Sequence, residues 1–125
     1  MGTGTTISPA LGMIELALRP TVINGHKFDN DFAVIWTSEQ FGANRVGRIR
    51  LSSSSAWQRE DTWDWHINPP LPIPPWGNGN ARSLELAQAA FRRAFERFHH
   101  DTSDRQWGDA FAMQRASSER PNKLG

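Results

Sequence analysis

Residues 63–98 read WDWHINPPLPIPPWGNGNARSLELAQAAFRRAFERF, and they contain the strongest evidence for the fold. It begins with alternating aromatic and polar residues, passes through a proline block and a Gly/Asn turn, and ends in an amphipathic segment. Strict alternation is typical of a half-buried strand, and apolar residues recurring every three or four positions are typical of a helix. The stretch therefore predicts a strand, a connecting loop and a helix that pack on one another.

The helical part has one apolar stripe on a 3.6-residue period. Ser83 is a good N-cap for this helix, and Glu85 lies where the helix dipole favours a negative charge. A stripe with three phenylalanines needs a broad apolar partner, which the tryptophan-bearing face of a sheet provides. The stripe consists of Leu84, Ala87, Phe91, Ala94, Phe95 and Phe98.

Upstream, the same alternation predicts a small sheet. Turns are expected at Asn24-Gly25 and at residues 42–44, Pro20 is expected to end the first strand, and residues 52–62 read as a flexible loop. Because the strands follow one another closely, an antiparallel meander is the simplest arrangement. The expected strands cover residues 13–18, 32–36, 46–51 and 63–67.

These elements predict an α+β fold in which an antiparallel sheet of three to four strands packs on one long C-terminal helix. A second short helix over residues 103–114, with Trp107, Ala110 and Phe111 on its inner face, is an optional addition. Residues 1–10 are expected to form a flexible arm, residues 11–114 a single domain, and residues 115–125 a flexible tail.

Composition narrows the function classes. The chain has 125 residues and no cysteine, which excludes disulfides, iron–sulfur clusters, thiolate zinc sites and a cysteine nucleophile. No signal peptide or apolar run of about 18 residues is visible, so a cytoplasmic protein that does not enter a membrane is expected. The net charge is only +1, with twelve arginines and two lysines. Codon bias in a GC-rich genome is the preferred explanation of that imbalance, over selection for phosphate contacts.

The proline block at residues 69–75 has two interpretations. Its PxxP spacings suit a polyproline II segment that docks on a partner domain, with Leu71, Ile73 and Trp76 as the partner-binding side chains. Alternatively, the block is a stiff lid whose apolar residues pack on the protein's own sheet. Trp76 adjoins the sequence GNGN, which we expect to be a flexible tip.

A polar cluster is expected on the outward face of the sheet, where Arg48, Arg50, Asp64 and His66 point away from the helix. A carboxylate beside an imidazole is a minimal acid/base pair. Ordinary cross-strand charge pairing explains the same residues. Since no nucleophile or oxyanion motif accompanies the pair, we expect no enzyme. The histidines have poor chelating spacing, so neither a metal nor another cofactor is expected.

Two resemblances follow from these residues. The first is carried by residues 46–49 (VGRI), by Trp63, Trp65, Ile67 and Pro69, and by the Ala/Phe pattern after Ser83. Over residues 46–98 the chain resembles a group of short bacterial proteins with no established activity. That resemblance implies a fold and no reaction.

The second resemblance is topological, to the three-strand-plus-helix DNA-binding domains of the AP2 type and of some integrase amino-terminal regions. In those domains Arg and Trp on the exposed sheet face read the major groove. The resemblance implies that Arg45, Arg48 and Arg50 contact DNA here. The chain departs from the pattern because Asp64 shares that face and a long proline loop precedes the helix.

Two functions are therefore carried forward. The first is a non-catalytic interaction module that binds a protein partner or its own copy through the Trp/Pro loop or a sheet edge. The alternative is a nucleic-acid-binding domain that uses Arg45, Arg48, Arg50 and His66 on the outer sheet face.

Overall fold

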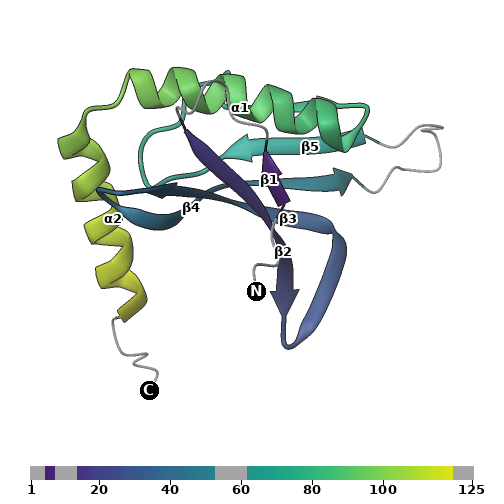
Figure 1. Ribbon diagram of the computed structural model, residues 1–125, viewed down its shortest axis with the longest axis horizontal. Helices are drawn as coiled ribbons and strands as arrows, with labels where there is room; N and C mark the ends of the chain where they lie inside the picture. The colour runs from purple at the N-terminus through teal and green to yellow at the C-terminus, as the bar shows by residue number, and fades with distance from the viewer. Residues whose placement is uncertain (1–4, 8–13, 53–61, 120–125) are drawn as a thin grey trace.

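The computed structural model describes residues 5–7, 14–52 and 62–119, and it has the expected α+β architecture. Six antiparallel strands lie in the order in which they occur in the chain, and two helices follow them (Figure 1). The meander is thus confirmed, with more strands than the sequence suggested. The elements are β1 Thr5–Ile7, β2 Glu15–Ile23, β3 His26–Ser38, β4 Gly42–Ser52, β5 Thr62–Ile67, β6 Asn78–Ala81, α1 Leu84–His100 and α2 Asp104–Glu119.

Alternating residues of the strands build the inner face of the sheet. Every second side chain of a strand points to the same side. Most side chains on the inner side of the sheet are buried, whereas Phe32, Leu51 and Trp63 are half-buried, and the rings of Phe32 and Trp63 stack on one another. This inner face is made by Leu16, Leu18, Val34, Trp36, Ile49, Trp65 and Ile67.

Helix α1 covers that inner face (Figure 1). The Oγ of Ser83 accepts a hydrogen bond from the N–H of Leu86 at 3.1 Å, which confirms the predicted N-cap. The predicted stripe is buried along the helix, at Ala87, Phe91, Ala94, Phe95 and Phe98. One face of the sheet is therefore closed by α1.

Gly47 of β4 allows α1 to approach this closely. A methyl group at Gly47 would lie 2.2 Å from Cε2 of Phe91 and 2.6 Å from the backbone oxygen of His66. Since backbone cannot yield as a flexible side chain does, only glycine fits under the Phe91 ring.

The expected flexible tip at residues 77–80 is instead part of the sheet. Asn78–Ala81 form β6 and pair with β5, with Gly79 opposite Trp65 and Ala81 opposite Trp63. A Cβ on Gly79 would lie 2.9 Å from the Trp65 indole. Small residues on β6 thus leave room for the large rings on β5, which is why a glycine-containing segment is a strand here.

Two further boundaries differ from expectation. Pro20 does not end β2, because the strand continues to Ile23 through a register shift between Pro20 and Thr21, and a bulge tolerates proline. The turn expected at residues 42–44 lies at residues 39–41, and Gly42, with φ of 75°, begins β4. The Asn24-Gly25 turn is confirmed by φ angles of 52° and 78°.

The ends of the domain extend beyond the expected limits. Within the expected arm, Thr5–Ile7 form β1 and pair with β2. Helix α2 runs to Glu119, so it takes in the first residues of the expected tail. Ser52 and Thr62, the ends of the expected loop, pair across β4 and β5. The remaining parts of the arm, loop and tail lie outside the described residues.

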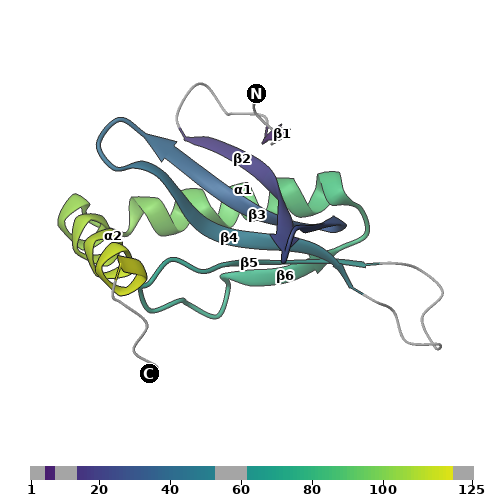
Figure 2. The ribbon, with the colours of Figure 1, turned by 90° about the horizontal axis from the view of Figure 1, so that it is seen from below.

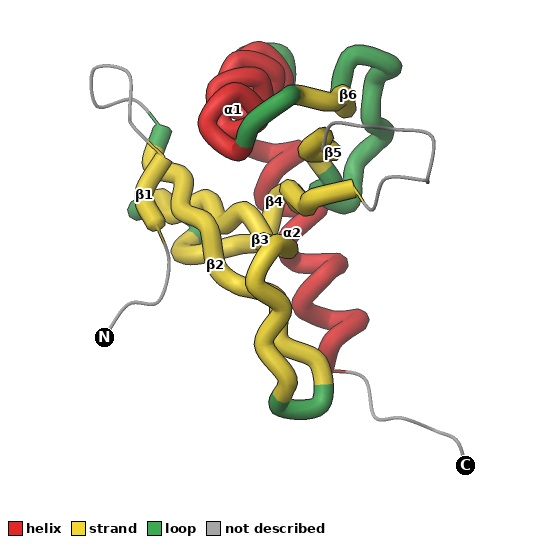
Figure 3. Tube along the Cα trace, turned by 90° about the vertical axis from the view of Figure 1, so that its right-hand side faces the viewer, coloured by secondary structure: helices red, strands yellow, loops and turns green. Residues whose placement is uncertain are grey.

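The second helix is present and completes an aromatic cluster. Trp107 and Phe111 stack with ring centroids 5.4 Å apart, and Trp107 meets Trp36 at 4.9 Å. Trp107, Ala110 and Phe111 are buried, as predicted. From this anchor α2 projects to the side of the sheet away from α1, and the β2–β3 hairpin projects to the same side (Figures 1 and 3). Neither helix is long and apolar enough to cross a membrane.

The Gly47 contact predicts opposite effects of alanine at two glycines. Gly47→Ala should lower the free energy of unfolding by about 1–3 kcal/mol, because the new methyl group clashes with Phe91 and with backbone. Gly108→Ala should raise it by about 0.5–1 kcal/mol, since its methyl group would lie 3.6 Å from Phe41 within a helix. Denaturant unfolding measures both. Equal effects of the two substitutions would contradict the close approach of α1 at Gly47.

Candidate functional site on the outer face of the sheet

The sheet face opposite α1 is left open by α1, and α2 lies beside one end of it (Figure 2). The strand registers place its outward residues in two rows across β3 to β6. One row runs Ala33, Arg48, His66, Asn78, and the other runs Asp31, Arg50, Asp64, Asn80. We call this surface the outer face.

A bulge in β4 brings Arg45 onto the outer face. Ile35 pairs with Arg45 whereas Val34 pairs with Gly47, so Val46 is an extra residue in β4. Without the bulge, Arg45 and Arg48 would point to opposite faces, because they are three positions apart on one strand. With it, Arg45 shares the outer face with Arg48, and Val46 is buried.

Arg48 is held in place by Asp31 of β3. Its Nε donates to Oδ1 of Asp31 at 2.8 Å and its Nη2 donates to Oδ2, which makes a bidentate ion pair. Both side chains are partly shielded from solvent. Thr21 donates a further hydrogen bond to Asp31 at 2.9 Å. The hydrogen bonds from Arg48 lower the pKa of Asp31, so this carboxylate stays ionised and the pair is close to neutral.

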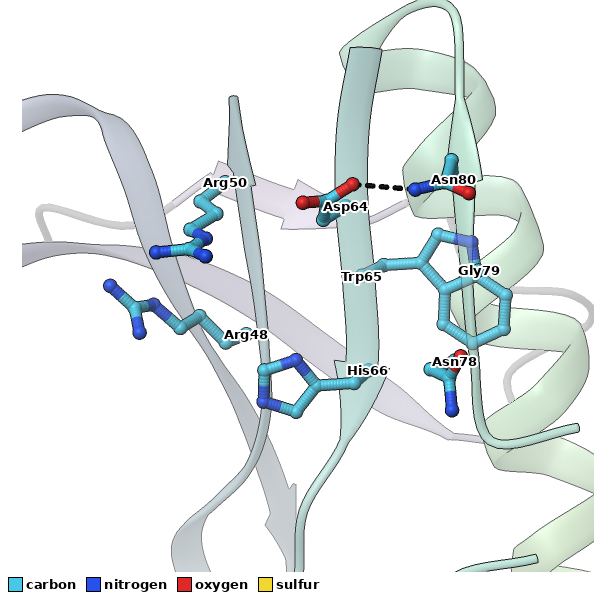
Figure 4. A pocket seen from close by; sticks show the side chains of 8 residues that line it. All are labelled: Arg48, Arg50, Asp64, Trp65, His66, Asn78, Gly79 and Asn80. Atoms are coloured by element: carbon cyan, nitrogen blue, oxygen red, sulfur yellow. Dashed lines mark hydrogen bonds between the residues drawn. The ribbon is translucent and has the colours of Figure 1, made fainter. Parts of the chain in front are cut away.

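A concavity of about 270 Å³ opens beside this pair, over β4, β5 and β6 (Figure 4). Arginines from β4 form one wall, and asparagines from β6 form the other. Its lining residues are Arg48, Arg50, Asp64, Trp65, His66, Asn78, Gly79 and Asn80.

Within the concavity the charged groups are separated rather than clustered. Asn80 Nδ2 donates to Oδ1 of Asp64 at 2.6 Å, which draws the carboxylate toward β6. The guanidinium groups of Arg48 and Arg50 extend the other way, away from β5 (Figure 4). The centre of the concavity therefore offers both donors and acceptors to a bound group.

His66 lies between these groups and favours its neutral form. Burial lowers its pKa, and the positive charges of Arg48, Arg45 and Arg50 lower it further, against a smaller opposing effect of Asp64. Its Nε2 lies 3.4 Å from Nδ2 of Asn68. Asp64 accepts its hydrogen bond from Asn80 and not from His66. Asp64 and His66 therefore share a face without forming the oriented acid/base pair that was considered from the sequence.

Leu71, Ile73 and Trp76, the residues predicted to bind a protein partner, lie in the proline loop and not on the outer face. Leu71 and Trp76 are partly buried and pack against the core, and Trp76 meets Phe98 with ring centroids 6.5 Å apart. The Arg97 guanidinium lies 4.1 Å from the centre of the Trp76 ring. Ile73 is 37% exposed. The structure therefore brings Arg48, Arg50 and His66 together with Arg45 nearby, and places the three loop residues apart from them.

Three residues of the site were not singled out from the sequence. Asp31 is brought to Arg48 by strand pairing between residues 17 positions apart. Asn78 and Asn80 were assigned to a tip, although their period-2 spacing on either side of Gly79 was a usable signal for a strand. Among the residues that the structure describes, no three His, Asp or Glu side chains converge as a metal site.

Comparison of the chain with protein-family models, with curated proteins and with solved structures finds no match. The two resemblances stated from the sequence therefore stay predictions. What the site does has to be argued from its own geometry.

From the hydrogen bonds between Arg48 and Asp31 we predict the direction of the pKa shift of Asp31. By carbon-detected NMR, Asp31 should titrate below its ordinary pKa of 3.8. Its charge then stabilises the fold above about pH 3.8, and that stability is lost as pH falls through the folded-state pKa. Arg48→Gln should raise the pKa of Asp31, and Arg50→Gln should raise it less because Arg50 acts only through its charge. The same upward shift in both variants would argue against the paired geometry.

Proposed function

We propose that this protein is a non-catalytic nucleic-acid-binding module that uses the outer face of its sheet. The observation that carries the proposal is the presence of Arg45, Arg48 and Arg50 on one strand of a face that α1 leaves open. Arginine is suited to phosphate oxygens because its planar group donates two parallel hydrogen bonds.

The three arginines have different parts in this proposal. Arg48 is fixed by Asp31 and mainly shapes the surface. Arg45 and Arg50 are exposed side chains without that restraint, so they are the proposed phosphate contacts. Their positions on β4 place them on both sides of Arg48.

The concavity favours a single-stranded ligand. Asn78, Asn80, His66 and Asp64 present amide, imidazole and carboxylate groups, which match the donors and acceptors on base edges. Those edges are accessible when bases are unpaired and turned outward. The proposal therefore has phosphates along β4 and a base edge over β5 and β6.

Affinity is expected to be modest. Asp31 neutralises Arg48, and Asp64 lies on the same face, so few positive charges remain available. With two or three phosphate contacts, log K should fall with log salt by about 1.5–2 per unit for a single strand. A cysteine-free chain suits the reducing cytoplasm, where such ligands are present.

The outer face is preferred to the Trp/Pro loop as the binding surface because Trp76, the aromatic residue of that loop, already packs within the protein. Trp76 packs on Phe98 and lies under Arg97, and Leu71 packs on the core. These contacts support the lid interpretation of the proline block. Of the three side chains predicted to bind a protein partner, Leu71, Ile73 and Trp76, only Ile73 is exposed.

Removal of two phosphate contacts tests the proposal. Arg45→Gln with Arg50→Gln should weaken binding of a short single-stranded oligonucleotide about tenfold at low salt and reduce the salt slope by about 1.4. Fluorescence anisotropy with single- and double-stranded DNA and RNA gives both quantities and identifies the favoured form.

The control removes two arginines from the opposite side of the protein. Arg93→Gln with Arg97→Gln on α1 changes the net charge equally and should leave most of the binding intact. Equal losses in both double variants would mean that only net charge matters. Absence of binding by the parent chain at low salt would rule the proposal out.

The pH dependence of binding tests the place of His66. Its pKa lies below the ordinary 6.5 in the free protein, and a bound phosphate favours the imidazolium. Affinity should therefore rise as pH falls through the pKa that His66 has in the complex, and level off below its lower pKa in the free protein. His66→Gln should abolish this rise, whereas His100→Gln, at the exposed end of α1, should keep it. A pH profile unchanged in His66→Gln would place the ligand away from the concavity.

A further inference from the structure

The outer end of the β2–β3 hairpin has an apolar surface that its own chain does not cover. Val22 is 59% exposed, Ile23 54% and Phe28 38%. This end extends beyond the body of the sheet (Figure 3). Three of the six exposed large apolar side chains among the described residues thus lie on this projecting strand pair.

One edge of this hairpin is open. β4 pairs with β3 from Asp31 to Ser38 and no further, so no described strand pairs with that side of residues 26–30. An open edge is a template on which another strand can pair. All five residues, HKFDN, are exposed.

The hairpin register determines which backbone groups the open edge presents. In a two-residue hairpin the residues flanking the turn, here Ile23 and His26, exchange both backbone hydrogen bonds. Phe28, opposite Thr21, likewise directs its backbone groups toward β2. Lys27, opposite Val22 between these two pairs, therefore directs its N–H and C=O outward. The same alternation, extended one residue past Phe28 and before the register shift that separates Phe28 from Phe32, directs those of Asp29 outward too.

We propose that two copies of this chain pair antiparallel through residues 26–30, about a two-fold axis at Phe28. Lys27 of each copy then lies opposite Asp29 of the partner subunit. Each Lys27–Asp29 couple exchanges two backbone hydrogen bonds and brings opposite charges together. The two Phe28 rings meet at the closely spaced position between the couples.

The charges select this register and this partner. Within the open edge, only Lys27 and Asp29 direct their backbone N–H and C=O outward. Antiparallel pairing of two copies can therefore form backbone hydrogen bonds in three registers: Lys27 opposite Lys27, Asp29 opposite Asp29, or Lys27 opposite Asp29. Two of them place Lys27 opposite Lys27 or Asp29 opposite Asp29, and like charges directly opposite are destabilising. The remaining register places unlike charges at both positions, which makes a second copy of the chain the complementary occupant.

The pairing is short, so the dimer is expected to be weak. Five residues from each copy bury well under the roughly 1,000 Å² that a stable interface requires. Dimers should therefore form reversibly, at concentrations of about micromolar or higher. This inference rests on the hairpin edge alone and is independent of nucleic-acid binding.

Sedimentation equilibrium of the full chain, from micromolar to millimolar concentration, tests the inference with a charge exchange. Lys27→Asp and Asp29→Lys each place like charges opposite one another, and each should raise the dissociation constant about tenfold or more. An equimolar mixture of the two variants should dimerise like the parent, because the mixed pair again has only opposite charges in contact.

Circular dichroism confirms that the variants fold, and Lys27→Asp combined with Asp29→Lys provides a second check because it should restore the homodimer. A parent chain that stays monomeric to millimolar concentration would overturn the proposal. So would a dimer that both single variants leave unchanged, or a mixture that fails to recover.

Discussion

The α1 phenylalanines pack on the inner face of the sheet and hold the two layers of the fold together. Phe91 lies directly over Gly47, and Phe95 and Phe98 continue the contact toward Trp36, Trp76 and the second helix. Because strand side chains alternate, closing one face with apolar rings sends the intervening polar residues to the other face. Arg48 and Arg50 of β4 are on an open surface for this reason.

Local irregularities then determine what that open surface contains. The extra residue Val46 moves Arg45 to the same side as Arg48, and the shift after Pro20 lets Thr21 reach Asp31. The Asp31–Arg48 pair fixes one guanidinium and removes most of its charge from the surface. The outer face is therefore a structured polar surface of modest positive charge, which suits selective contact better than strong attraction.

The sequence predicts the elements that have a clear period and misses those that depend on distant partners. The α1 stripe, its Ser83 cap and the inward tryptophans of β5 follow from spacing alone. β6 was missed although Asn78 and Asn80 have the spacing of a strand, because the glycine between them fits a strand here only beside the Trp65 indole. The Arg48, Arg50 and His66 cluster was predictable from alternation, whereas Asp31 depends on strand register and Arg45 on a bulge.

The outer face, and not the helical side, is the proposed contact surface for nucleic acid. Amide chemical shifts of the nitrogen-labelled chain, followed while a short single-stranded oligonucleotide is added, distinguish these two surfaces. We predict that the shifts of residues 45–50, 64–66 and 78–80 change progressively while those of residues 87–98 in α1 stay constant. Changes confined to α1, or spread evenly over both sides of the sheet, would contradict the account.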